Sequence, residues 1–321
     1  VELAVAQLNA QRGDRPPLTL RRTPTEMTSA VQVAALLRDD PAVVGVVGHP
    51  ESGTTQEALP IYEDANGAGR RAVAVVTPTA TSPALSGRSR WLFRICPTDA
   101  SASEAVARFV VDSLHARRAA IVYRNDSYGR DWTRSFAAAY RAAGGTVVQR
   151  DPYVSGGTEW AAYAAYMAQQ GAEVLLFPGS VEDAEHAIRA VRATGREIPF
   201  IGGDAASGLE EHAAEFAGAR YTAFFDARLA RTPEARAFVA AFEQRFGHAP
   251  DQRAALAYDA AMLIGRAALD VGHDRRRVRD ALAAIDSAHA VEGAAGRIAF
   301  DANQDATGKS VVVATVGGAA R

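Results

Sequence analysis

Small polar side chains follow two apolar runs of the sequence, and their chemistry is that of hydrogen bonding to a ligand. Ser52 comes after the run AVVGVVG, and Thr79, Ala80 and Thr81 come after the run AVAVVT. Hydroxyl and backbone N–H groups beside a helix N-terminus can hold an anion without an arginine. Serine and threonine can also simply cap helices, so both interpretations remain open at this point.

Three further polar residues follow apolar runs later in the chain. They are Tyr128 in YRNDSYGRD, Ser180 in FPGSVED and Asp204 in IGGDAASG. An acid at such a position can bind a cationic group, and an aromatic residue can cover a ligand. The alternatives are a core or turn role for Tyr128 and a cap of the helix near Leu209 for Asp204.

Catalytic motifs are absent from the sequence. No HExxH, GxSxG or GxxxxGK[ST] motif occurs, and no GxGxxG stands between a strand and a helix. No histidine and carboxylate are placed by the sequence to activate Ser52; His49 is better explained as a loop residue than as a general base. The single cysteine, Cys96, excludes a cluster of thiolate metal ligands. We therefore expect no enzyme, no metal and no cofactor, and a serine hydrolase using Ser52 is only a remote alternative.

The composition is that of a globular protein with a full core. The 321 residues are 48% hydrophobic and 22% charged, and 35 basic against 37 acidic residues give a net charge of −2. Such a balance creates no field that would recruit nucleic acid or an anionic membrane. No apolar run approaches the roughly 20 residues that span a bilayer, so direct membrane insertion is not expected. The start, VELAVAQLNA, lacks a charged and apolar leader, and any leader is expected to have been removed.

Strands and helices alternate along the chain. Near-continuous runs of valine, isoleucine and leucine are typical of strands that are covered on both faces, and between them lie helical patterns. The runs occupy residues 42–48, 72–77, 119–124, 173–178 and 199–203. This alternation predicts an α/β fold with doubly wound parallel sheets, and the length favours two lobes with a cleft between them. The final segment, GRIAFDANQDATGKSVVVATV, resembles a β-hairpin.

The order of several motifs resembles the branched-chain amino acid family of type I periplasmic binding proteins. The matching segments are ELAVAQLNA, AVVGVVGHPESGTTQ, VTPTATSP, WLFRICPTD, AIVYRNDSYGRD, ALAYDAAMLI and GAAGRIAFDANQD. Each segment alone is weak evidence, but their order holds over nearly the whole chain.

The resemblance implies two lobes joined by a three-strand hinge, with crossings near Thr98, Ala227 and Val291. The N-terminal lobe takes residues 1–98 and 228–291, and the C-terminal lobe takes residues 99–227 and 292–321. In the first lobe, Ser52 and the loop of Thr79, Ala80 and Thr81 correspond to the groups that bind the ligand carboxylate. In the second lobe, Tyr128 corresponds to the aromatic residue that closes over the ligand, and Asp204 corresponds to the acid that binds the ligand's ammonium group. At Ser180 the family has a larger polar or aromatic residue, which puts specificity for leucine, isoleucine or valine in doubt.

The function implied by the resemblance is capture of a small zwitterion, an amino acid above all, by lobe closure. The ligand would be delivered to the permease of an ABC transporter. The location implied is periplasmic or extracellular, free or lipid-anchored, and the protein would be a monomer. A ligand-sensing receptor domain of the same fold is the first alternative. A transcriptional regulator is disfavoured because no helix-turn-helix segment precedes residue 1.

Overall fold

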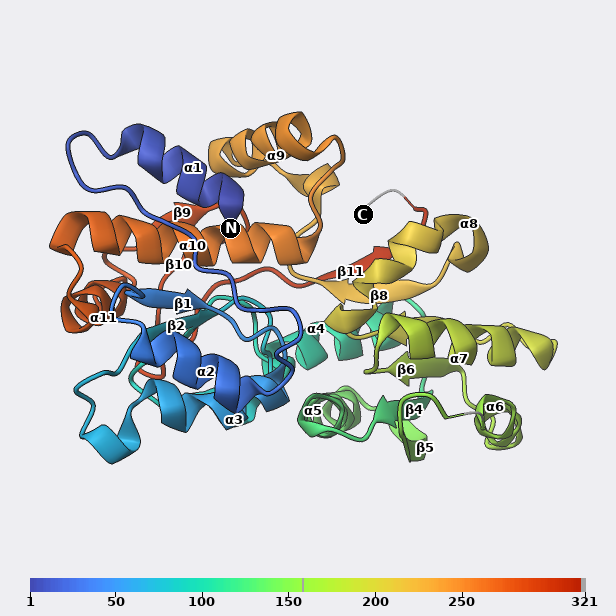
Figure 1. Cartoon of the computed structure of the whole chain (residues 1–321). Helices are drawn as coiled ribbons and strands as arrows, with labels where there is room; N and C mark the ends of the chain where they lie inside the picture. Colours follow the sequence, from blue (N-terminus) through green and yellow to red (C-terminus); the bar gives the residue numbers. More distant parts are fainter. Residues whose placement is uncertain (158, 319–321) are drawn as a thin grey trace. The chain divides into compact units, whose positions relative to one another are not determined.

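The computed structural model describes residues 1–157 and 159–318, which form two compact units (Figure 1). The first unit combines residues 1–97 with residues 230–310, and the second combines residues 98–229 with the C-terminal segment from Val311. Both units are built from parallel strands and helices, as the alternating apolar runs predict.

The first unit is built around a short parallel sheet with the strand order β1-β2-β3. Its strands are β1 (Gly45–Val47), β2 (Ala74–Thr77) and β3 (Leu92–Arg94), and a separate antiparallel hairpin pairs β9 (Val291–Gly293) with β10 (Gly296–Ile298). Its helices are α1 (Glu2–Gln11), α2 (Ala30–Asp39), α3 (Ser52–Tyr62), α9 (Pro233–Phe246), α10 (Gln252–Val271) and α11 (Arg275–Ala283), with short 3₁₀ helices at Ala65–Gly67 and Pro83–Leu85. In Figure 1, α1 lies along α10.

Helices cover both faces of this sheet. A core cluster joins Ala34 and Leu37 of α2 and Leu59 of α3 to the strand residues Val46 and Val75. On the other face, Leu8 of α1 and Ala261 of α10 pack together, and Val47 of β1 packs against them. The apolar runs are near-continuous because each strand must bury side chains on both of its faces.

The second unit contains a six-stranded sheet with the order β11-β8-β7-β6-β4-β5, parallel except for β11. Its strands are β4 (Arg118–Arg124), β5 (Thr146–Tyr153), β6 (Val174–Phe177), β7 (Phe200–Gly202), β8 (Arg220–Ala223) and β11 (Val312–Thr315). Its helices are α4 (Asp99–Asp112), α5 (Ser127–Ala142), α6 (Trp160–Gln169), α7 (Val181–Ala193) and α8 (Ala213–Phe216), with 3₁₀ helices η3 (Asp204–His212) and η4 (Ala227–Leu229).

Two separate core clusters show that this sheet is doubly wound. Ile121 and Leu176 point to a cluster with α4 and α5, whereas Leu175 and Phe177 point to a cluster with α6 and α7. Successive residues of a strand face opposite sides, so neighbouring residues serve opposite helix layers. At the end of α7, Gly195 has φ +71°, the left-handed conformation that its place in the sequence predicts.

The C-terminal part of the chain differs from the sequence expectation. Residues 296–316 do not form a hairpin of their own, because β10 pairs with β9 and β11 pairs with β8. Residues 292–310, which we assigned above to the C-terminal lobe, belong to the first unit. The buried Asp259 of α10 holds this segment there: its carboxylate accepts hydrogen bonds from the N–H groups of Ala294 (2.6 Å) and Ala295 (2.9 Å). Such long-range pairing leaves no local pattern in the sequence.

Candidate ligand-binding site

In the first unit, Ser52 is the first residue of α3, directly after the loop that follows β1. Its side chain is buried, and its Oγ accepts a hydrogen bond from the N–H of Ser82 at 3.2 Å. It does not cap the helix, because the N-cap residue is Glu51. Since the Oγ acts as an acceptor in this bond, the hydroxyl hydrogen remains available for an acceptor such as a ligand oxygen.

A loop after β2 lies against the loop after β1. The hydroxyl of Thr77 donates to the carbonyl of His49 (2.7 Å) and accepts from the N–H of Ala80 (3.2 Å). The hydroxyl of Thr79 donates to the carbonyl of Pro50 at 2.7 Å. These bonds fix the two loops to each other, and the hydrogen of the Thr79 hydroxyl is already used in doing so.

Thr81 differs from Thr79 although both are threonines of the same loop. Its side chain is fully buried, and within the described residues its Oγ1 has no hydrogen-bond partner. Burying a hydroxyl without a hydrogen-bond partner costs free energy, because its hydrogen bonds to water are lost and not replaced. Of the two threonines, Thr81 is therefore the one whose hydroxyl is available to bind a ligand.

Arg94 supports this loop from inside the unit, and the sequence reasoning missed it. The guanidinium is almost fully buried, donates to the carbonyl of Ser82 (2.6 Å) and forms an ion pair with Asp305 (2.7 Å). Its contact with the carbonyl fixes the backbone of the loop from Ala80 to Ser82. A signal was present: an arginine at the end of the apolar run WLFRI can be buried only if it is paired.

His49 contributes to packing in the same unit. Its Nε2 lies 3.0 Å from the hydroxyl of Tyr62, and burial lowers the pKa of His49. This contact agrees with the loop role expected from the sequence.

In the second unit, Tyr128 and Asp204 form a buried pair. Tyr128 is the second residue of α5, and Asp204 begins η3 directly after β7. The phenol hydroxyl donates to Oδ1 of Asp204 at 2.9 Å. Burial raises the pKa of Tyr128 well above its ordinary value, and the charges of Asp204 and Asp99 raise it further. The phenol therefore stays protonated and acts as a fixed donor to the carboxylate.

Gly203 makes room for this pair. A Cβ at this position would lie 2.0 Å from the Tyr128 hydroxyl oxygen, well inside any allowed contact. A glycine before Asp204 is thus a geometric requirement of the Tyr128–Asp204 hydrogen bond.

Ser180 follows the neighbouring strand β6 and is the N-cap of α7. Its Oγ accepts from the N–H of Asp183 (3.3 Å) and donates to the carboxylate of Asp183 (2.7 Å). Its hydroxyl is engaged in capping the helix, and a ligand contact from Ser180 stays a prediction.

Each unit thus gathers its share of the predicted residues at the carboxyl ends of its strands. The first unit brings Ser52 together with the loop of Thr79, Ala80 and Thr81, and the second brings Tyr128 to Asp204. In an open α/β sheet, this edge is where ligands bind. Among the described residues, no group of three or more histidine, cysteine or acidic side chains could hold a metal ion. Nor does that part of the chain contain a helix long and apolar enough to cross a bilayer.

Comparison with known proteins decides the family. The model of the family described as "Periplasmic binding protein" matches residues 1–320. The chain belongs to this family. It is 27% identical over 205 residues to the Leu/Ile/Val-binding protein of Citrobacter freundii, a match that covers 63% of this chain and 54% of that protein. The chain thus spans about half the length of the curated relatives it matches.

Solved structures agree with this assignment. A leucine-binding protein from Thermotoga maritima is 25% identical, with a TM-score of 0.85 over 98% of this chain and 89% of that one. A branched-chain amino acid transporter substrate-binding protein from Streptococcus pneumoniae, solved with isoleucine, has a TM-score of 0.86 at 24% identity and covers 98% of this chain and 88% of its own. The latter likeness concerns the fold alone. Together these neighbours confirm the predicted two-lobed periplasmic binding protein fold.

Proposed function

We propose that this periplasmic binding protein captures an amino acid and presents it to the permease of an ABC transporter. The observation that carries the proposal is the complementary chemistry of the two units. The first offers uncharged donors at Ser52 and Thr81, and the second offers the carboxylate of Asp204. A zwitterionic amino acid has a carboxylate that suits the donors of the first unit and an ammonium group that suits the carboxylate of the second.

In this proposal the ligand carboxylate binds to the first unit. It accepts the hydroxyl hydrogen of Ser52 and that of Thr81, close to the N-terminus of α3. The partial positive charge of a helix N-terminus favours an anion there. The hydrogen bonds from Thr79 to Pro50 and from Arg94 to Ser82 keep the loop in shape, so that its donors lose little entropy on binding.

The ammonium group binds to the second unit in the same proposal. Asp204 provides the counter-charge, and the Tyr128 hydroxyl holds this carboxylate in one orientation. Closure of the units on the ligand stabilises the closed form, since only there does the ligand contact both. Both ligand charges are desolvated together, and a ligand that lacks one of them leaves buried protein groups unpaired.

The relatives support an aliphatic amino acid as the ligand class and a periplasmic or extracellular location. The curated relative is a Leu/Ile/Val-binding protein, and the Thermotoga protein is a leucine-binding protein. We propose that the protein acts as a monomer and is not an enzyme.

Calorimetric titration with the twenty amino acids tests the proposal. We expect saturable binding of at least one aliphatic amino acid, and a loss of affinity of about tenfold or more in Ser52→Ala and in Asp204→Asn. The exposed residues Ser113 and Asp112 give matched controls, Ser113→Ala and Asp112→Asn, which should bind like the parent protein. Unchanged affinity in both site variants would refute the site, and no binding of any amino acid would refute the ligand class.

A further inference from the structure

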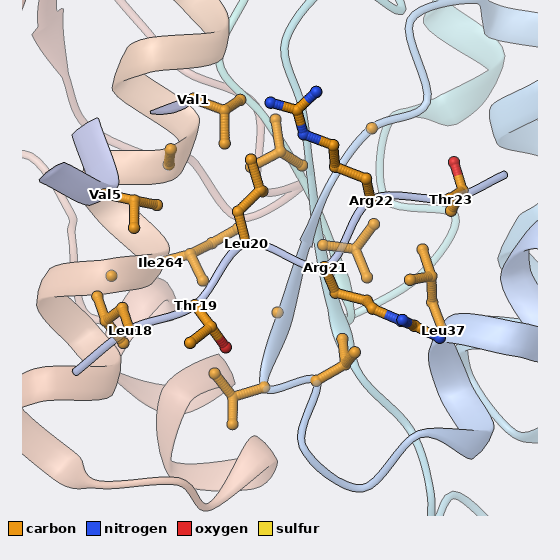
Figure 2. Close-up of a pocket in the computed structure, with 18 of the residues that line it drawn as sticks. Val1, Val5, Leu18, Thr19, Leu20, Arg21, Arg22, Thr23, Leu37 and Ile264 are labelled. Atoms are coloured by element: carbon orange, nitrogen blue, oxygen red, sulfur yellow. The ribbon is translucent and has the colours of Figure 1, made fainter. Parts of the chain in front are cut away.

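The proposed site leaves two features of the structure unused. One is a groove of about 590 Å³ beside β1 in the first unit, lined by apolar side chains such as Val5 and Ile264 and by the exposed Arg21 and Arg22 (Figure 2). Its mixed lining does not select one class of ligand. The other feature is a polar cluster around Asp183 in the second unit, whose hydrogen-bonding groups are specific enough to do so.

Asp183 is a buried acid in the first turn of α7. Its Oδ2 accepts hydrogen bonds from the hydroxyls of Ser155 (2.9 Å) and Ser180 (2.7 Å). Within the described residues, no basic side chain forms an ion pair with Asp183, and its Oδ1 accepts no hydrogen bond. Since a buried carboxylate is stabilised by each further donor, Oδ1 suits a hydrogen-bond donor of a ligand.

The hydroxyl of Tyr153 lies near this carboxylate. Tyr153 ends β5, and its ring stacks on Phe177 (ring centroids 5.3 Å apart) and meets Trp160 edge-on (4.9 Å), so its position is fixed. Burial raises the pKa of Tyr153 and the charge of Asp183 raises it further, so the hydroxyl keeps its proton. The hydroxyl and the carboxylate lack the geometry of a hydrogen bond, and within the described residues the hydroxyl has no partner. The cluster thus holds a fixed donor and an acceptor that do not satisfy each other.

The cluster adjoins the hydroxyl of Tyr128. The carbonyl of Phe177, at the end of β6, accepts hydrogen bonds from the N–H groups of Gly179 and Gly203, both at 3.1 Å. A Cβ on Gly179 would lie 2.0 Å from the hydroxyl oxygen of Tyr153, and a Cβ on Gly203 would lie 2.0 Å from that of Tyr128. The two hydroxyls therefore lie beside two loops that share one carbonyl. The cluster is thus a neighbour of the acid that we propose binds the ammonium group.

A hydroxyl or a carboxamide suits this cluster, because each of these groups can accept one hydrogen bond and donate another. It would accept from the hydroxyl of Tyr153 and donate to Oδ1 of Asp183. A methyl group in the same place would leave both protein groups unpaired, which costs free energy. A carboxylate would be repelled by the charge of Asp183.

We propose that Tyr153 and Asp183 select the side chain of the captured amino acid: a short, uncharged side chain that carries a hydroxyl or a carboxamide, as in threonine, homoserine or asparagine. This inference rests on the proposed function, in which Asp204 binds the ammonium group, and it specifies the side chain of that ligand. Asp204 follows β7, and the cluster lies at the end of the adjacent strand β6. Paired strands are about 5 Å apart, which is within the reach of such a side chain.

Calorimetry with pairs of amino acids of nearly equal shape tests the proposal. Threonine is compared with valine, homoserine with norvaline, and asparagine with leucine. The polar member of at least one pair should bind about tenfold more tightly than its apolar counterpart, because only the polar member satisfies both groups of the cluster. In Tyr153→Phe this preference should fall at least about threefold. The thermal midpoint of this variant should stay that of the parent protein, because the hydroxyl has no partner to lose.

Tyr163→Phe is the matched control. The hydroxyl of Tyr163 donates to the carbonyl of Pro152 at 3.0 Å in the same unit, and its loss should leave the preference unchanged. Apolar amino acids that bind as tightly as their polar counterparts would overturn the proposal and leave the proposed function standing. A preference that Tyr153→Phe does not reduce, or that Tyr163→Phe reduces equally, would overturn it as well. Binding of no amino acid at all would instead refute the proposed function, and this inference with it.

Discussion

The two candidate half-sites differ in how their chemistry is distributed. In the first unit, the uncharged hydroxyls of Ser52 and Thr81 share the task, and the bond from Thr79 to Pro50 fixes their two loops to each other. In the second unit, one carboxylate is held by one phenol. Replacing one of several neutral donors should therefore reduce ligand affinity only moderately. Replacing the single charged residue of the other half-site should remove most of the affinity.

The largest effect is expected at Asp204. The substitution Asp204→Asn keeps the shape and an oxygen that can accept from Tyr128, but removes the charge that we propose binds the ammonium group. Truncating a buried charge pair costs about 2–5 kcal/mol, which is a loss of affinity of about 30-fold or more. Calorimetry with the preferred amino acid measures it. If Asp204→Asn bound the amino acid as tightly as Ser52→Ala does, the proposed difference between the two half-sites would be wrong.

The next effect concerns the orientation of that carboxylate. We expect Gly203→Ala to weaken ligand binding by about tenfold, because its Cβ would occupy the place of the Tyr128 hydroxyl. Tyr128→Phe should weaken it by about threefold, since it removes one hydrogen bond without a clash.

Tyr140→Phe is the matched control for this prediction. The Tyr140 hydroxyl donates to the carbonyl of Ala116 inside the same unit, at 2.9 Å. Its loss should lower thermal stability and leave affinity unchanged. If Tyr140→Phe reduced affinity as much as Tyr128→Phe, the effect would be one of general stability and not of orientation.

A smaller effect should separate the two threonines of the first unit. Thr81→Val removes the hydroxyl without a partner and should weaken binding about threefold with little loss of stability. Thr79→Val removes the bond to Pro50 and should lower the free energy of unfolding by about 1 kcal/mol while changing affinity less. Ligand titration and denaturant unfolding of both variants measure these changes. A larger loss of affinity in Thr79→Val and a larger loss of stability in Thr81→Val would contradict the prediction.

The smallest effect is a pH dependence that belongs to the first unit. Burial lowers the pKa of His49 in the folded state below its ordinary 6.5. The unfolded chain therefore takes up this proton first as the pH falls, so the stability contribution is complete above pH 6.5 and is lost below it. Between pH 7 and pH 5 the thermal midpoint should fall by about 2 °C more in the parent protein than in His49→Gln. The exposed His273, changed to Gln, should behave like the parent.

Much of this architecture could be predicted from the sequence, because buried parallel strands require continuous apolar runs. The runs at 72–77 and 173–178 contain β2 and β6. The strand β5 was not predicted: it lies at the sheet edge, and its sequence TVVQRDPY mixes exposed and buried positions. The partner of β11 was also beyond prediction, since pairing between residues about ninety positions apart leaves no local signal.

The positions of the candidate residues at the strand ends could be predicted, but their hydrogen bonds could not, and their contact with a ligand stays a prediction. Strand ends and the family resemblance pointed to Ser52, Tyr128 and Asp204. Only coordinates distinguish Thr79, whose hydroxyl is bonded within the loops, from Thr81, whose hydroxyl is not. The run WLFRI signals that Arg94 needs a partner, but its bond to the carbonyl of Ser82 appears only in the structure.

Titration with three related ligands tests the central claim most directly. Leucine, its amide without the carboxylate, and 4-methylpentanoate without the ammonium group are titrated into the parent protein, Ser52→Ala and Asp204→Asn. If the first unit binds the carboxylate and the second the ammonium group, the effect of Ser52→Ala should disappear with leucinamide, and that of Asp204→Asn with 4-methylpentanoate. Equal effects of each substitution on all three ligands, or the two dependences exchanged, would contradict the account.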